Sequence, residues 1–152
     1  MTQPGMFGAV FAALYAAHMV GDHWVQTQRQ SDTKGAPGWR GRLACAAHVA
    51  TYTTTALVAL LLLAWHLRQP LSPGWLAAGL AVSAVSHYVA DRREPLRRIS
   101  EALQALTGKA DFYRLGACRP GRDDNPSLGT GAYALDQSWH VGWLFVAALL
   151  IA

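Results

Sequence analysis

Three pairs of histidine and aspartate, each spaced four residues apart, are the side chains of this sequence best suited to chemistry. The pairs are His18 with Asp22, His87 with Asp91 and, in the reverse order, Asp136 with His140. Residues four apart lie on one face of a helix, so each pair can present an imidazole nitrogen and a carboxylate oxygen in the same direction. Such groups bind divalent metal ions and transfer protons.

The pairs occur in long apolar segments. Apolar residues make up 52% of the 152-residue chain and charged residues only 14%, against about 25% in an average soluble domain. Four segments have the length, roughly 17 to 25 residues, that a helix needs to cross a bilayer. Helices are therefore predicted at about 7–27, 43–67, 74–91 and 132–152. We expect one all-α domain over residues 1–152, an integral membrane antiparallel four-helix bundle.

Basic residues are distributed unevenly among the three predicted loops. The first and third loops hold every lysine and arginine except Arg68, which lies in the short second loop. Because basic residues are retained on the cytoplasmic side, the first and third loops are predicted to be cytoplasmic and both termini to lie outside. The N-terminal segment lacks the basic start of a secretory signal, so the first helix is interpreted as a retained span.

This topology explains why the third pair is reversed. The first and third helices run toward the cytoplasm, which puts Asp22 and Asp91 one turn closer to it than their histidines. The fourth helix runs the other way, so Asp136 precedes its histidine. The second helix adds His48 within two turns of the same face. The sequence thus predicts one layer near the cytoplasmic face, with histidines deep and aspartates shallow.

Three aspartates in this layer need compensation. An ionised aspartate at a helix centre costs about 2.5 to 3.5 kcal/mol on insertion scales, and no lysine or arginine lies on the four helix faces. A shared proton, a histidinium or a bound cation would each offset the cost. The candidate metal ligands are His18, Asp22, His48, His87, Asp91, Asp136 and His140.

Nitrogen and oxygen donors favour zinc, with manganese or iron as alternatives. The set exceeds the four ligands that close one structural zinc site. Two metal ions bridged by a carboxylate, or one ion with carboxylates that orient the imidazoles, both fit the number of residues.

Other polar residues adjoin the candidate ligands. Gln26, Tyr52 and Gln137 are candidates to support them. His23 is excluded because it lies about 100° round the helix from Asp22, and His66 because it lies at the opposite interface.

The third loop is predicted to contain an amphipathic helix at about 95–114, which either lies in the membrane interface or packs on the ends of the bundle. Asp123 and Asp124, in a Gly- and Pro-rich segment, are either solvated or fold over the mouth of the bundle. Four arginines beside the third helix either bind an anionic lipid head group or form a collar that sets topology. They are Arg92, Arg93, Arg97 and Arg98.

Taken together, the motifs resemble a known family. H-x3-D-x3-Q from His18, a lone helical His48, H-x3-D from His87 and D-Q-x2-H from Asp136 are similar in type and order to small bacterial and phage membrane proteins catalogued as domain of unknown function 3307. The resemblance covers nearly the whole chain. It implies a multi-pass protein of the bacterial inner membrane without an established activity. A looser similarity to bacterial membrane proteins described as metal-dependent hydrolases favours hydrolysis.

The leading hypothesis is a metal-dependent hydrolase acting on a lipid or lipid-linked phosphate. Asp22, Asp91 or Asp136, whichever does not bind the metal, would be the catalytic general base. The alternatives are a transporter of metal ions or protons and a noncatalytic membrane scaffold. Expected partners are the lipid bilayer and an anionic head group, with no nucleic acid, and the oligomeric state is left open.

Overall fold

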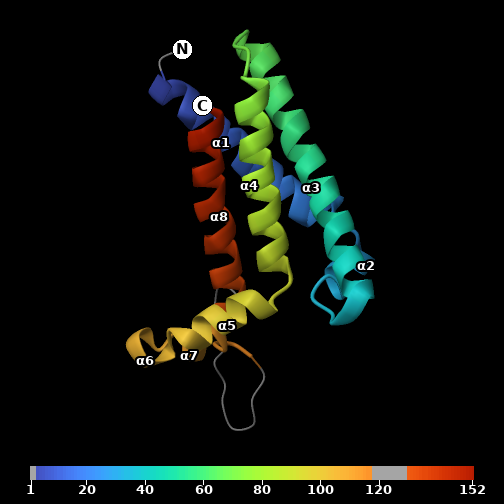
Figure 1. Cartoon of the computed structure of the whole chain (residues 1–152), viewed down its shortest axis with the longest axis vertical. Coiled ribbons are helices and arrows are strands. Elements are labelled where there is room, and N and C mark those ends of the chain that lie inside the picture. The colour runs from blue at the N-terminus through green and yellow to red at the C-terminus, as the bar shows by residue number, and fades with distance from the viewer. Residues whose placement is uncertain (1–2, 118–129) are drawn as a thin grey trace.

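The structure of the protein, a computed structural model, describes residues 3–117 and 130–152. All regular elements within these ranges are helices (Figure 1), so the all-α prediction is confirmed. Four long helices form a bundle: α1 (Gln3–Val20), α3 (Gly38–Leu67), α4 (Pro73–Asp91) and α8 (Gly131–Ile151).

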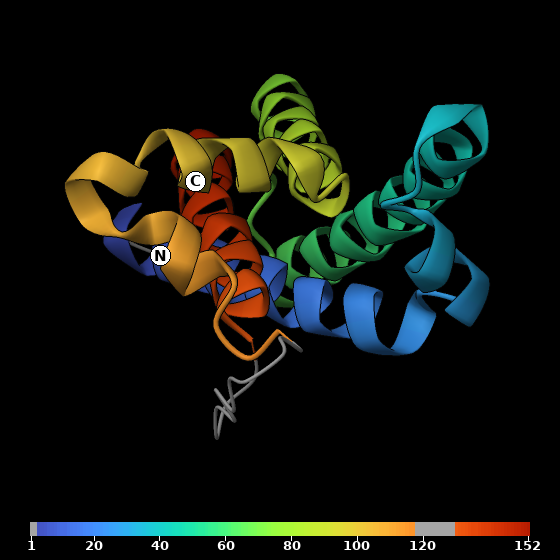
Figure 2. The ribbon, with the colours of Figure 1, turned by 90° about the horizontal axis from the view of Figure 1, so that it is seen from below.

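Each long helix packs against two others. α1 and α4 both contact α3 and α8. In Figure 1 α4 runs antiparallel to α3 and α8, whereas α1 crosses behind them obliquely. Figure 1 shows both termini and the α3–α4 turn at one end of the bundle, with the short helices at the other. Seen from below in Figure 2, the short helices lie across that second end. One end of the fold therefore consists of the termini and the short α3–α4 turn, and the other end consists of the longer loops and the short helices.

The half of the bundle nearer the termini is closed by apolar packing. Its buried residues include Leu14, Leu60, Leu80 and Leu144. Small residues bring the helices close together: a Cβ atom on Gly79 would lie 2.4 Å from Cγ1 of Ile151, so α4 and α8 can pack at this distance only without a side chain there.

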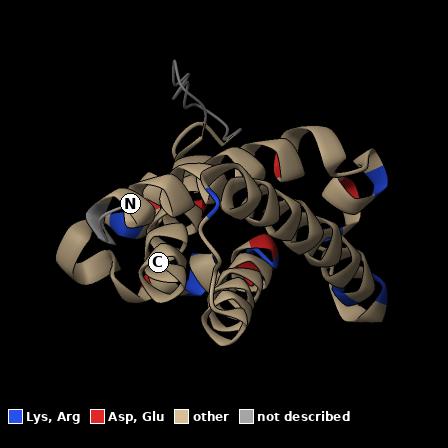
Figure 3. Ribbon diagram, turned by 90° about the horizontal axis from the view of Figure 1, so that it is seen from above, with Lys and Arg blue, Asp and Glu red and all other residues tan. Residues whose placement is uncertain are grey.

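Two helices, α3 and α8, are long and apolar enough to cross a membrane. Their most apolar windows have mean hydropathies of 1.6 and 1.3 and are only 22% and 28% buried, so most of each window lies on the outside of the structure. α1 and α4, with 18 and 19 residues, are shorter and are not among the helices that meet this criterion. Figure 3 shows the long helices mostly without charged residues.

The end opposite the termini differs from the sequence expectation in two places. The first loop contains a short helix, α2 (Gln28–Thr33), which begins with a capping box formed by Thr27 and Gln30. The helix expected at 95–114 is divided into α5 (Glu94–Ala102), α6 (Gln104–Thr107) and α7 (Lys109–Tyr113). The break before α7 falls at Gly108, whose φ of 62° ends a helix readily.

The divided segment packs on the end of the bundle. α5 contacts α4 and α8, and α7 contacts α8, through buried residues that include Leu96 and Ala110. Of the two positions considered for the amphipathic segment, the structure has the one against the bundle. Asp123 and Asp124 lie outside the described residues.

Candidate metal centre

The four long helices bring all of the predicted histidines and aspartates to one place, at the end opposite the termini. Each of the four histidine residues is at most 3% exposed. Their rings are in contact: the centroids of His87 and His140 are 4.2 Å apart, and those of His18 and His140 are 4.9 Å apart and stacked. The predicted layer of imidazoles and carboxylates is therefore a single packed cluster.

The tightest arrangement is centred on His48 and His87, whose Nε2 atoms are 3.0 Å apart. Oδ1 of Asp22 lies 3.4 Å from each of these nitrogens. Oδ2 of Asp91 lies 3.2 Å from His48 Nε2 and 3.3 Å from His87 Nε2. Ligands bound at about 2.0–2.2 Å to a tetrahedral ion lie about 3.3–3.6 Å apart. Two triangles of donor atoms, sharing the His48–His87 edge, thus have nearly the dimensions that one metal ion requires.

The two carboxylate oxygens of these triangles are deeply placed but poorly satisfied. Asp22 Oδ1 and Asp91 Oδ2 are buried, and neither accepts a hydrogen bond of good geometry from the described residues. Buried acceptors normally find a donor, because an unsatisfied one costs about 1–3 kcal/mol. Two such oxygens facing the same pair of imidazole nitrogens indicate a site for a cation.

Asp22 reaches this position from a π-helix. α1 continues directly into η1 (Gly21–Val25), and the backbone N–H of Gln26 donates to the carbonyl of Gly21 at 2.9 Å. A Cβ atom on Gly21 would lie 3.1 Å from Cδ2 of Tyr52, so the glycine allows η1 to approach α3 closely. Single π-helical turns are frequent at functional sites. Here the turn places a carboxylate beside His48, which lies on α3.

The remaining pair, Asp136 and His140, lies on α8 next to the two triangles. His140 Nδ1 donates to the backbone carbonyl of Asp136 at 2.8 Å, which leaves Nε2 as the acceptor nitrogen. Asp136 Oδ2 lies 3.5 Å from His140 Nδ1 and accepts from Gln137 Nε2 at 3.3 Å. Oε1 of Gln137 lies 3.4 Å from His18 Nε2.

Three overlapping sets of side chains could hold a metal ion, with ligand atoms within 4.8 Å of one another. The sets are His18, Asp22 and His87; His48, His87 and Asp91; and Asp91, Asp136 and His140. All seven candidate ligands therefore belong to at least one set. Asp91 and His87 each belong to two.

Lys34 is a member of the site that sequence reasoning missed. It follows α2, and its Nζ lies 2.7 Å from Asp91 Oδ1, with the residue only 9% exposed. The sequence predicted that no lysine or arginine on the four helix faces pairs with the aspartates. The partner that the structure shows, Lys34, comes instead from the first loop. Its position depends on the path of the loop, which Arg92 holds by donating to the carbonyls of Lys34 at 2.5 Å and Ala36 at 2.7 Å. Because the path of the loop depends on tertiary contacts, residue spacing in the sequence does not predict it.

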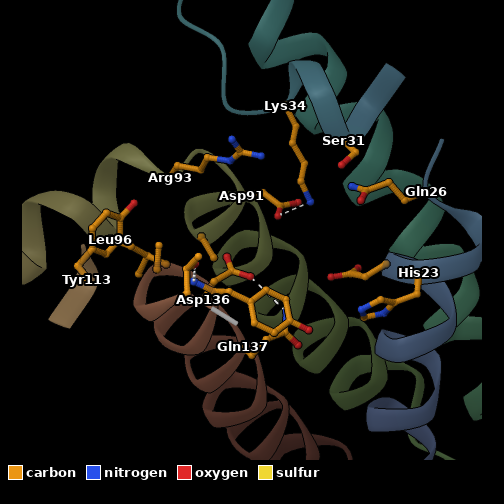
Figure 4. A pocket seen from close by; sticks show the side chains of 15 residues that line it. His23, Gln26, Ser31, Lys34, Asp91, Arg93, Leu96, Tyr113, Asp136 and Gln137 are labelled. Carbon is orange, nitrogen blue, oxygen red and sulfur yellow. Dashed lines mark hydrogen bonds and ion pairs between the residues drawn. The ribbon is translucent and has the colours of Figure 1, made fainter. Parts of the chain in front are cut away.

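A cavity of about 570 Å³ opens beside the cluster. All three aspartates line it, whereas none of the four clustered histidines does. The order predicted from the topology, histidine deep and aspartate shallow, is the order in the structure. Figure 4 shows Asp91, Lys34, Arg93, Asp136 and Gln137 around this space.

The expected supporting residues have different positions. The Tyr52 ring stacks on His87 with centroids 4.0 Å apart, and its hydroxyl pairs with Ser83 Oγ at 2.7 Å. Gln26 lines the cavity. The two excluded histidines lie apart from the buried cluster: His23 is exposed and donates to the Met19 carbonyl, and His66 is in the last turn of α3.

The four arginines considered for an anionic head group are not equivalent. Arg92 binds loop carbonyls, as described above. Arg97 pairs with Glu94 and Glu101 at 2.7 and 2.6 Å, and Arg98 pairs with Glu94 at 2.8 Å. Hydrogen bonds from Arg97 and Arg98 lower the pKa of Glu94 to about 2, so these surface pairs persist across the physiological range. Arg93 alone of the four lines the cavity.

Comparison with known families places the chain in one of them. Residues 10–152 match the model of the family described as "Protein of unknown function (DUF3307)". The chain belongs to the DUF3307 family. The resemblance inferred from the motifs is therefore confirmed. Searches of curated proteins and of solved structures gave no match.

Replacing Arg92 by lysine tests whether its guanidinium holds the Lys34 loop of this DUF3307 protein. Arg92→Lys keeps the charge but cannot reach both carbonyls, so we expect unfolding in detergent to be easier by about 1.5–3 kcal/mol, the range for hydrogen bonds to charged groups. Amide exchange at residues 34–41 should become faster. The matched control is Arg97→Lys, which alters an exposed pair and should change stability by less than about 1 kcal/mol. Equal effects of the two substitutions would contradict this role.

Proposed function

We propose that this DUF3307 protein is a multi-pass membrane metalloprotein that hydrolyses a lipid or lipid-linked phosphate. Its metal ion is held between His48, His87, Asp22 and Asp91. The observation that carries the proposal is the pair of donor triangles, each with sides of 3.0 to 3.4 Å that suit three ligands of one small ion.

Charge supports a divalent ion. If all three aspartates are ionised, the ammonium of Lys34, the only lysine or arginine group in ion-pair contact with them among the described residues, leaves two negative charges without an ion-pair partner. One divalent cation neutralises them. Without it, the cluster would have to take up protons or bury net charge, which is costly in an apolar surrounding.

The imidazoles also fit an ion bound through Nε2. The Nδ1 atoms of His48 and His87 are buried and have no hydrogen-bond partner among the described residues. Their Nε2 atoms instead face each other and the carboxylates of Asp22 and Asp91, and coordination of an ion at Nε2 would leave the proton on Nδ1. Two nitrogen and two oxygen donors favour zinc, with manganese or iron as alternatives.

The packing of the bundle supports four membrane spans. α1 and α4 lie alongside α3 and α8, the two helices that are long and apolar enough to span. If these two cross the bilayer, the helices packed between them occupy the same depth. Large apolar side chains are exposed on all four outer faces, as at Tyr15, Val58, Val85 and Phe145. An apolar outer surface of this kind is suited to contact with lipid.

The chemistry we assign is attack of water on a phosphate ester. The bound ion would act as a Lewis acid and lower the pKa of water toward about 7. Asp136 belongs to neither donor triangle and lines the cavity with its side chain 28% exposed, so it is the general base. It accepts the proton as the water oxygen bonds to phosphorus and the ester P–O bond breaks. The departing oxygen takes a proton from solvent water in the cavity, and Asp136 then returns its proton to solvent.

Transport is the less well supported alternative. It needs a polar path from the cluster to the end of the bundle that carries the termini. The buried core in that direction is formed by residues such as Leu14, Leu60 and Leu144, whereas the residues that line the cavity lie on the other side of the cluster. The apolar half supports chemistry with access from one side.

Metal content tests the site directly. We expect the full chain, purified in mild detergent and analysed by elemental mass spectrometry, to hold about one divalent ion per chain. His48→Ala and His87→Ala should lose it because each removes a shared corner of both triangles. His66→Ala is the matched control, an imidazole at the far end of α3, and should retain the ion. A well-folded wild-type protein that takes up no added zinc, manganese or iron would refute the metal site.

Asp136→Asn separates catalysis from metal binding. This variant keeps the size of the side chain but cannot accept the proton, so we expect the metal content to be unchanged and phosphate release to fall about 100-fold or more. The measurement is release of inorganic phosphate from a panel of lipid phosphates in mixed micelles by the metal-loaded protein. Failure of the wild-type protein to hydrolyse any of them, with metal bound, would count against a hydrolase.

Topology can be tested with single cysteines in a background where Cys45 and Cys118 are replaced by serine. Gln69→Cys, in the α3–α4 turn, should react with a membrane-impermeant maleimide added to intact spheroplasts. Ala105→Cys, in α6, should react only after lysis, because the basic loops are retained inside. Labelling of both positions in intact spheroplasts would argue against four spans in the orientation proposed.

A further inference from the structure

We infer that Arg93 is the anion-binding residue of the cavity and that its ligand is a phosphate group. The inference rests on the proposed function, because it names the chemical group that the metal centre acts on. Arg93 lies at the junction of α4 and α5, and Figure 4 shows its guanidinium extending toward Lys34 and Asp91. The phosphate could be carried by a lipid or be free in solution.

The backbone of Arg93 has an unusual conformation. Its φ of 60° and ψ of −45° are rarely adopted by a residue with a side chain. The turn is held by backbone hydrogen bonds from Arg93 N to the Ala90 carbonyl at 2.8 Å and from Arg97 N to the Arg93 carbonyl at 3.0 Å. Such strain persists where the surroundings enforce it and is concentrated at functional sites. Here it lies at the sharp turn from α4 into α5.

The stem of Arg93 packs across the first loop. A Cβ atom on Gly35 would lie 2.9 Å from Arg93 Cδ and 3.1 Å from its Nε. Gly35 follows Lys34 in the chain. The contact between Arg93 and Gly35 therefore brings the charged side chains of Arg93 and Lys34 to the same cavity. Arg92, the preceding residue, uses its guanidinium to hold the carbonyls of the same loop. The Arg93 guanidinium pairs with no carboxylate among the described residues.

The charge of the occupied site explains what this guanidinium can bind. One divalent ion balances the aspartates and Lys34, so Arg93 adds a positive charge that the chain does not neutralise. A planar guanidinium donates two parallel hydrogen bonds to a phosphate and is well suited to it. Hydroxyl groups of Ser31, Tyr113 and Tyr133 line the same cavity and offer further donors.

Phosphate binding by metal-loaded protein in phosphatidylcholine nanodiscs tests this role. Titration calorimetry with inorganic phosphate is the first arm, and native mass spectrometry of nanodiscs containing phosphatidate is the second. Arg93→Ala should weaken phosphate binding at least 10-fold in whichever arm shows binding, and Arg93→Lys should restore part of it. Arg98→Ala, which removes the same charge from an exposed residue nearby, is the matched control and should change binding less than 2-fold.

The two arms identify the source of the phosphate. Binding that depends on Arg93 in either arm supports the inference, and binding of phosphatidate alone identifies a lipid head group. Unchanged binding in Arg93→Ala, equal losses in Arg93→Ala and Arg98→Ala, or no binding in either arm would overturn it. Metal content is measured on the same samples. A wild-type protein without metal refutes the proposed function, whereas a metal-loaded Arg93→Ala that binds phosphate normally refutes only the role of Arg93.

Discussion

The gathering of three carboxylates at one end of an apolar bundle, one of them buried and two partly buried, is the constraint on which the rest of this structure depends. Asp22, Asp91 and Asp136 come from three different elements and meet around imidazoles that are almost completely buried. Like charges this close destabilise a folded chain unless cations lie among them. The chain itself supplies one, Lys34, and arranges nitrogen donors where a second can bind. Stability of the bundle and occupancy of the site are therefore coupled, because an ion that binds only the folded state stabilises it.

The loops at the same end are explained by that requirement. α2 and the turn after it are needed to return the chain to Asp91, and Arg92 holds the returning backbone at two carbonyls. Gly41 is part of this arrangement, since a Cβ atom there would lie 2.0 Å from the Ala36 carbonyl oxygen. A segment that looks like a polar connector in the sequence is therefore a structural part of the site.

The contrast between helices and loops decides how much the sequence could predict. The four helices, the cluster of seven ligands and the depth order of histidine and aspartate follow from periodicity and from the reversed third pair, because helix geometry relates spacing to direction. Lys34 and the division of the 95–114 segment at Gly108 do not follow, because they depend on tertiary contacts of nonrepetitive chain. The π-helical turn at Gly21 was likewise missed: it depends on close packing against Tyr52, which no local pattern reports.

The depth order has a chemical consequence. The cavity exposes carboxylates, while the imidazoles lie behind them and the apolar core lies behind the imidazoles. A cation entering from the cavity would first exchange its water ligands for the carboxylate oxygens of the aspartates. It would then reach the imidazole nitrogens, behind which lies the apolar core. An anionic substrate approaching by the same route would meet Arg93 at the rim before it reaches the centre. Under the proposed function, this arrangement suits an ion that stays bound while small molecules come and go from one side.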